Sequence, residues 1–302
     1  MSNTFTTASD LATVAAKIVG LDLNLAGHVY RDVAADFSSG QGSTVRIPVP
    51  GAVKTNTISI YNTTVPLVAS ELNEQGIDVT LSTHAYSRVP LADGHLDLDI
   101  TDLARQVLAP QAQSIVRYVE TEVAAALTAT PETTSITYDP ANPARSFTAI
   151  RRKLRDNGVK ADAPMIAAVG SDVFADLLDG PTGSAGTTFD ANGKVRGFTV
   201  VESTRLAPGE IVGFIKEAFA LVVRAPRVPD GASFGHSVTT QNDDGTSFAV
   251  RYIRDFDSAL AIDTSLVSAY VAAQALPLAV DREDGTVALV ENGGAIRVLT
   301  AA

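Results

Sequence analysis

The longest helical pattern of apolar positions runs from Leu98 to Leu127. Apolar residues recur there at spacings of three, four and seven, as on one face of an α-helix: Leu98, Leu103, Val107, Ile115, Val116, Val119 and Val123. Asp99 is placed to cap the N-terminus, and Asp102 adds negative charge to the first turn. The pattern predicts a helix about 40 Å long, bent at Pro110, which removes the hydrogen bond to the Gln106 carbonyl.

Residues 1–42 begin with a shorter amphipathic pattern. Thr7 or Ser9 is available as the N-cap. The predicted apolar face consists of Leu11, Val14, Ala15, Ile18 and Val19. A helix with so little core of its own fits two interpretations. It is either an arm that packs on a neighbouring subunit or the first helix of a globule.

In residues 43–92 the apolar and polar positions alternate with a period of two. Thr44–Val49 and Ile77–Ser82 alternate apolar and polar residues, as half-buried strands do. The stretch between them is rich in Thr, Asn, Val and Ser, and Pro48, Pro50 and Pro66 discourage ordinary sheet pairing. A loop of this length inside a compact domain is uncommon and is usually functional. We therefore expect a long two-stranded excursion from the body.

The second half of the chain mixes short helices and strands. The patterns predict helices at Arg145–Asn157 and Ser171–Leu178, polar loops at 180–197 and 226–245, and a final hairpin of Val287–Val290 with Ile296–Leu299 around Asn292–Gly294. Strands are expected at Met165–Val169, Phe198–Val201, Glu210–Ile215, Ala218–Arg224, Phe248–Arg254 and Ala259–Asp263. Leu266–Leu276 is apolar and fits either a strand or a helix. The predicted fold class is α+β.

Composition narrows the function classes. The chain has 302 residues, a net charge of −11, and neither cysteine nor tryptophan. Disulfides and thiolate metal sites are thereby excluded. A protein that wraps nucleic acid tightly needs clustered Lys and Arg, which this acidic balance disfavours. No apolar run is long enough to span a membrane, and we expect neither a secretory signal nor a membrane partner.

Candidate chemical sites are weak. The four histidines, His28, His84, His95 and His236, lack metal-ligand spacing. Asp97, Asp99 and Asp102 contain hard oxygen ligands, but acids at a helix N-terminus are better explained by capping. Gly180–Gly186 has neither a nucleophile elbow nor a phosphate-loop lysine. Asn242–Gly245 resembles part of a calcium loop whose other ligands are missing.

The basic residues concentrate in one predicted helix. They are Arg145, Arg151, Arg152, Lys153 and Arg155, without interleaved aromatic residues. A solvated face or a contact with an acidic partner surface is favoured over nucleic-acid binding. No catalytic, cofactor-binding or metal-binding residue is predicted, no cofactor is expected, and the chain is not expected to be an enzyme.

The order of these pieces, together with several short stretches, resembles the major capsid (coat) protein of tailed bacteriophages. The amino-acid sequence of these stretches is similar to that of the coat-protein family common among phages of actinobacteria. The stretches are Gly76–Asp102, Leu108–Gln111 with the helix through Leu127, Leu154–Gly158, Val169–Ser171, Gly197–Thr204 and Tyr252–Asp263. The resemblance spans most of residues 40–275.

The resemblance implies a tailed-phage capsid fold. Its parts would be an N-terminal arm (1–42), an extended loop (43–92), a peripheral domain with the spine helix (93–130 and 246–265), an axial domain (131–245), and a C-terminal strand and β-hairpin tail (266–302). The tail lies beyond the family pattern. Some such shells carry a Lys–Asn side-chain bond, for which Lys54 is a possible donor, although a gatekeeping or salt-bridge charge is the preferred interpretation of Lys54.

The resemblance also implies partners and a location. The main partner is the protein itself, in the hexamers and pentamers of an icosahedral shell that encloses double-stranded DNA without sequence-specific binding. A separate scaffolding protein, a portal, assembly in the bacterial host cytoplasm and a final place in the virion are implied too. Two alternatives are an encapsulin-type nanocompartment shell and a soluble α/β hydrolase or transferase, which would need a convergent polar constellation.

Overall fold

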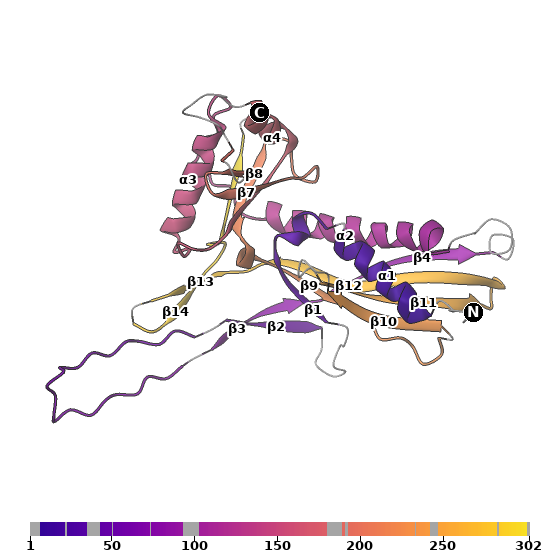
Figure 1. Cartoon of the computed structure of the whole chain (residues 1–302), viewed down its shortest axis with the longest axis horizontal. Coiled ribbons are helices and arrows are strands. Elements are labelled where there is room, and N and C mark those ends of the chain that lie inside the picture. Colours follow the sequence, from indigo (N-terminus) through magenta and orange to yellow (C-terminus); the bar gives the residue numbers. More distant parts are fainter. Residues whose placement is uncertain are drawn as a thin grey trace, which may run out of the picture.

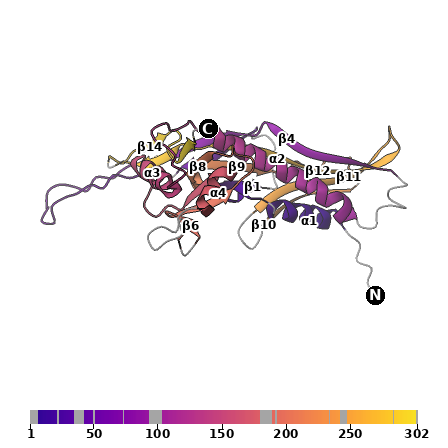
Figure 2. The ribbon, with the colours of Figure 1, turned by 90° about the horizontal axis from the view of Figure 1, so that it is seen from above.

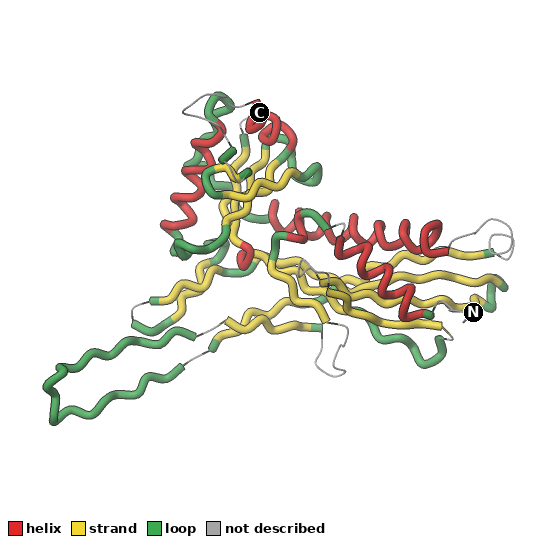
Figure 3. Tube along the Cα trace, in the orientation of Figure 1, coloured by secondary structure: helices red, strands yellow, loops and turns green. Residues whose placement is uncertain are grey.

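The computed structural model describes residues 7–21, 23–34, 43–49, 51–72, 74–92, 103–179, 189–190, 193–232, 234–241, 247–282 and 284–300. It contains two sheets with their own helices, and a loop that projects from the junction between them (Figure 1). Figure 3 shows that the helices lie over the two sheets, whereas the projecting loop lacks regular structure beyond its root.

The larger sheet has six strands, and β12 (Ile262–Ala275) is at its centre. One edge of β12 pairs with β11 (Ser247–Asp257), which in turn pairs with β10 (Phe234–Gln241). The other edge is shared by β4 (Thr83–Leu91) along one half and β9 (Phe219–Arg224) along the other. A parallel strand, β1 (Tyr30–Ala34), completes the sheet beyond β9.

Helices α1 (Ala8–Leu21) and α2 (Ala109–Thr128) cover one face of this sheet and contact each other (Figures 1 and 2). Thr7 and Asp10 cap α1 reciprocally: the Asp10 N–H donates to Thr7 Oγ1, and the Thr7 N–H donates to Asp10 Oδ2 at 2.9 Å. The buried stripe of α1 is Leu11, Ala12, Ala15, Ala16 and Val19. Val14, expected on that stripe, is exposed. The buried stripe of α1 is part of the main core, and β1 pairs with β9 in the six-stranded sheet, so both elements pack within this chain as the first helix and strand of the globule.

The predicted long helix is continuous from Leu103 to Thr128, but its first turns are not α-helical. Residues Ala104–Leu108 form a π-helical segment, η3, and α2 follows with Pro110 in its first turn. Proline removes one backbone donor and crowds the carbonyl four residues back, and a widened turn accommodates both effects. The predicted N-terminal part from Leu98, with its caps Asp99 and Asp102, lies outside the described residues.

The smaller sheet has five strands in the order β15 (Ala295–Leu299), β8 (Glu210–Ile215), β5 (Met165–Val169), β7 (Phe198–Glu202) and β6 (Lys194–Val195). Helix α3 (Pro143–Asp156) packs on β8 and β15 through Phe147, Ile150 and Leu154, and it also contacts α4 (Ser171–Asp179). Gly213 permits this approach, since a Cβ there would lie 2.5 Å from Ile150 Cγ2.

The predicted C-terminal hairpin is wrong in its pairing. Val287–Val290 forms β14, but its partner is β13 (Leu278–Asp281), and the later strand β15 pairs with β8. The turn at 291–294 exists, with Asn292 at φ 52°, yet it connects strands of different sheets. The reason is burial: Ala295, Ile296 and Val298 are at most 4% exposed beside β8, which a free hairpin would leave in water.

Three further expectations differ from the observed strands and their boundaries. The ambiguous Leu266–Leu276 segment is mostly strand β12, and the expected polar loop at 226–245 contains the edge strand β10. The expected strand Ala259–Asp263 is largely the turn between β11 and β12, with Ala261 at φ 53°. The expected boundaries at 92, 245 and 265 all fall in or beside the six-stranded sheet, because β4, β9, β10 and β12 pair there.

Candidate assembly surface

A projecting loop, defined here as residues 51–72, leaves the body of the molecule (Figures 1 and 2). It departs from the predicted strand pair, β2 (Thr44–Val49) and β3 (Gln75–Thr80), which is antiparallel as expected. Many of the large exposed apolar side chains of the described residues lie on it: Val53, Ile58, Ile60, Tyr61, Val65, Leu67, Val68 and Leu72. Ile60 is 89% exposed and Tyr61 is 85% exposed. Such a cluster marks a surface that a partner covers.

The backbone of the projecting loop is also largely unpaired. Among the described residues, the one backbone hydrogen bond within 51–72 joins the Asn62 N–H to the Ser59 carbonyl at 3.0 Å. Its two limbs touch through side chains: Asn56 Nδ2 donates to Ser70 Oγ at 3.1 Å, and Ser70 Oγ donates to the Lys54 carbonyl at 3.4 Å. Extended limbs with free N–H and C=O groups are templates for strand addition by another chain.

The tip of the loop is a preformed turn around Asn62. Its side-chain Oδ1 accepts the N–H groups of Thr64 and Val65 at 3.3 and 3.0 Å, and its Nδ2 donates to the Val65 carbonyl at 2.6 Å. Asn residues form such Asx turns readily. The turn holds the exposed pair Ile60 and Tyr61 at the far end of the loop, so less conformational entropy is lost when the tip binds a partner.

The root of the loop has a small hydrophobic core of its own. Ile47, Val79 and Leu81 pack on the face of the six-stranded sheet opposite the helices, against Ala220, Val222 and Leu276. A neighbouring cavity of about 220 Å³ has a mostly apolar lining that includes Tyr30, Ile47, Ile77, Leu276 and Leu278. Alternation along β9 explains this separate core, because Leu221 and Val223 point into the main core while Ala220 and Val222 point away from it.

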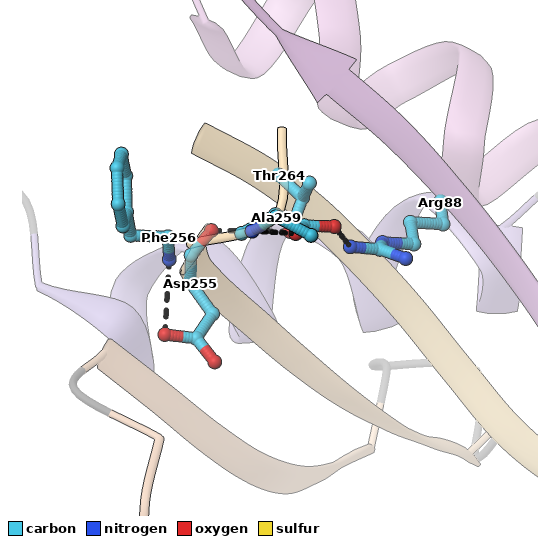
Figure 4. Close-up of polar contacts among 6 residues, drawn as sticks. Arg88, Asp255, Phe256, Ala259 and Thr264 are labelled. Carbon is cyan, nitrogen blue, oxygen red and sulfur yellow. Dashed lines mark hydrogen bonds and ion pairs between the residues drawn. The ribbon is translucent and has the colours of Figure 1, made fainter. Parts of the chain in front are cut away.

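The far end of the six-stranded sheet is held by charged side chains (Figure 4). Arg88 on β4 binds Asp257 on β11 at 2.9 Å, and Asp257 Oδ1 accepts the Ala259 N–H at 3.0 Å. That backbone donor, followed by Arg88, lowers the pKa of Asp257. Thr264 Oγ1 donates to the Asp255 carbonyl at 3.1 Å, and Phe256 is 58% exposed beside this network.

The residues considered as candidates for a chemical site do not form a cluster in the described part of the structure. Three of the histidines are described: His28 follows η1 (Leu25–Gly27), His84 is on β4, and His236 is on β10. The His84 ring lies tilted against those of Tyr86 and Tyr270, with ring centroids 5.8 and 5.0 Å apart. No group of three metal-binding side chains occurs within the described part of the chain. His95, Asp97, Asp99 and Asp102, together with Gly180–Gly186 and Asn242–Gly245, lie outside it.

The basic residues of α3 divide into two groups. Arg151 donates to the Arg196 carbonyl at 2.9 Å, and Arg155 donates to the carbonyls of Val159 and Ala161. These two arginines therefore fasten loops of the five-stranded sheet. Arg145, Arg152 and Lys153 are exposed, and Arg152 lies 3.9 Å from Asp156. Within the described ranges, no helix is long and apolar enough to cross a membrane.

A two-sheet body, a helix laid along one sheet and a projecting loop with exposed apolar side chains indicate a structural protein whose surfaces, and not a chemical site, carry its function. The sequence profile of the phage capsid protein family matches residues 95–289. The chain belongs to this family. It is a phage capsid protein of the virion shell and not a member of an enzyme class. The encapsulin-type and hydrolase alternatives are not favoured by this match.

Solved capsid structures share the fold. The capsid of an empty GTA particle is 10% identical, with 100% of this chain and 93% of that chain covered and a TM-score of 0.57. Mycobacterium phage Adephagia is 9% identical, with 93% and 90% covered and a TM-score of 0.55. Mycobacterium phage Che8 is 13% identical, with 99% and 92% covered and a TM-score of 0.50. No curated protein sequence matches significantly. These likenesses confirm the tailed-phage capsid fold and the α+β class.

Proposed function

We propose that copies of this capsid protein build the shell by laying the projecting loop of one copy on the body of the next. The supporting observation is the loop itself, with exposed apolar side chains and unpaired backbone on a preformed tip. A neighbour that covers one limb supplies hydrogen-bond partners and removes apolar surface from water at about 25 cal/mol per Å². Repeated around a ring, modest contacts of this kind add up to a stable shell.

The parts of the chain take the following roles in this proposal. Residues 43–80 form the extended loop and its root, the six-stranded sheet with α2 forms the peripheral domain, and the five-stranded sheet with α3 and α4 forms the axial domain. Residues 8–34 belong to the peripheral domain, and the strand β15 belongs to the axial domain. The axial domains meet around the symmetry axes of hexamers and pentamers in an icosahedral shell.

The remaining partners follow from the shell role. The shell encloses double-stranded DNA without sequence-specific binding, and the net charge of −11 disfavours tight trapping of that DNA. A separate scaffolding protein and a portal act during assembly, which takes place in the host cytoplasm. Lys54 lies in the loop limb as an ordinary charge with no assigned acceptor for a side-chain bond.

Deletion of Lys54–Asn73 tests the role of the loop. Val49 and Gln75 are paired, so the remaining residues 50–53 and 74 suffice to close the shortened loop. We expect a folded subunit that assembles poorly, measured by circular dichroism and by size-exclusion chromatography with negative-stain imaging. The full chain should elute at megadalton size, alone or with scaffolding protein. Global unfolding of the deletion variant would show that the stretch is core.

A substitution variant separates loop chemistry from loop length. Replacing Ile60, Tyr61 and Leu67 by serine removes apolar surface and leaves the chain length unchanged. The matched control is Leu178→Ser on α4, which is 61% exposed and lies outside the loop. We expect the triple variant to lose assembly while the control assembles normally. Equal assembly of both variants, or a full chain that stays monomeric with scaffolding protein present, contradicts the proposed function.

A further inference from the structure

The β13–β14 hairpin (residues 278–290) lies between the five-stranded sheet and the projecting loop (Figures 1 and 3). It belongs to the tail after Pro277, which was expected to lie beyond the family pattern; that expectation is wrong for most of the hairpin, because the family profile extends to residue 289. Its two strands pair with each other, and among the described residues neither strand joins the larger sheets. A hairpin of this size is marginally stable alone, so its position depends on what it touches on either side.

On one side the hairpin is fastened to the end of α3. Gly158, at φ +100°, ends the helix and leaves room for Val280, since a Cβ on Gly158 would lie 3.0 Å from both Val280 methyl groups. Lys160 Nζ binds Asp281 Oδ2 at 3.1 Å. Asn157 Nδ2 donates to the Gly293 carbonyl at 3.0 Å, which fixes the chain just after the hairpin.

On the other side the hairpin touches the loop at two levels. Gln75 Nε2, at the root, donates to the Val287 carbonyl at 3.2 Å. Farther out, the turn residue Gly285 lies against the limb: a Cβ there would be 2.6 Å from the Lys54 backbone nitrogen. Two contacts at different distances from the root restrict the angle of the loop as well as its position.

We propose that the β13–β14 hairpin is a positioning element that holds the projecting loop at a fixed angle to the five-stranded sheet. This inference rests on the proposed function, because the loop angle matters only if the loop docks on another copy. The limbs have almost no backbone pairing of their own, so without the hairpin the loop would swing about its root. The hairpin thereby selects the direction in which the next copy is added.

Gly285→Val is the first test, because a branched side chain there collides with the Lys54 backbone. Gly193→Val is the matched control: Gly193 also has positive φ, at +71°, but nothing lies within 4 Å of its added Cβ. The chain lacks cysteine, so Thr63→Cys at the loop tip and Leu178→Cys on α4 accept a pair of spin labels. The label–label distance distribution then reports the loop angle in the free subunit.

We expect a narrow distance distribution in the parent and in Gly193→Val, and a shifted or broader distribution in Gly285→Val. A second variant replaces residues 279–289 by Asn-Gly. Because Leu278 and Val290 are paired, a two-residue turn can join them and leave β12 and β15 in place. This variant should broaden the distribution at least as much. Both variants should give fewer or misshapen particles under conditions in which the parent assembles.

Unchanged distance distributions in both hairpin variants would overturn the inference, even if assembly suffered. A parent protein whose loop distances are already broad would overturn it too. Failure of the parent to assemble counts against the proposed function alone, because the distance measurement on free subunits still reports what the hairpin does.

Discussion

The buried carboxylate of Glu120 on α2 offers the sharpest stability prediction. Oε1 accepts the N–H groups of Asn24 and Ala26 at 2.7 and 3.1 Å, and Oε2 accepts the Leu25 N–H at 3.0 Å. These donors are the first N–H groups around η1, which have no partner within that helix. Asn24 Nδ2 also donates to the Glu202 carbonyl on β7, so this turn links α2 to the five-stranded sheet.

Glu120→Ala leaves three N–H groups without an acceptor. Leu25 and Ala26 are at most 1% exposed, so water does not reach the region freely. An unpaired buried donor costs about 1–3 kcal/mol. The alanine variant no longer has to bury a carboxylate, and the desolvation cost that it avoids offsets part of the destabilisation from the three unpaired donors. We expect a loss of about 3–5 kcal/mol, a large share of a typical stability of about 5–15 kcal/mol.

Glu120→Gln should be milder. The amide oxygen can still accept from Asn24 and Ala26, but the amide NH2 faces the Leu25 N–H and cannot accept from it. We expect a loss of about 1–3 kcal/mol. Urea unfolding of unassembled subunits, followed by circular dichroism, measures the free energy of unfolding of each variant. The control is Glu122→Ala, at a partly buried position of the same helix. A loss below about 1 kcal/mol for Glu120→Ala, or equal losses for Ala and Gln, refutes this reasoning.

Two further perturbations test the core and its pH dependence. Val116→Asp places an unpaired charge at a position only 7% exposed and should prevent folding; normal soluble yield would show that the helix face is assigned wrongly. Burial, aided by Arg31 for His28 and by Arg251 for His84, lowers the pKa of both histidines below 6.5. The unfolded chain therefore takes up protons first as pH falls, so the free energy of unfolding should decrease below about pH 6.5. The double variant His28→Gln/His84→Gln should flatten that decrease in urea titrations, and a stability that rises on acidification would contradict it.

Local patterns predicted the elements whose burial is set by a single face. Ile115, Val116, Val119 and Val123 are all buried on α2, because the helical period places them toward the sheet. The β2–β3 pair was predictable for the same reason, since its alternation reflects one covered face. The recognition of the family depended on the order of such elements and not on a chemical site.

Long-range pairing was not predictable from local pattern. Val287–Val290 and Ile296–Leu299 look like the two strands of a hairpin because a turn sequence separates them. The burial that β15 gains beside β8, far earlier in the chain, decides the pairing instead. β10 is a polar edge strand, so its sequence pattern does not distinguish it from a loop. The role proposed for 278–290 depends on contacts with residues such as Gly158 and Lys54, which no sequence period connects.

The path of the chain accounts for the place of the hairpin between the five-stranded sheet and the projecting loop. After α2 the chain enters the five-stranded sheet, and at Phe219 it returns to the six-stranded sheet, where Phe219 packs edge-on against Phe214. Its last crossing, from Leu276 to Gly294, leads back to β8 and passes both the end of α3 and the root of the loop. Any change in the angle between the two sheets therefore moves the ends of the hairpin. Because the hairpin also touches Lys54 and Gln75, the proposed positioning role predicts that the loop follows such a change in the free subunit.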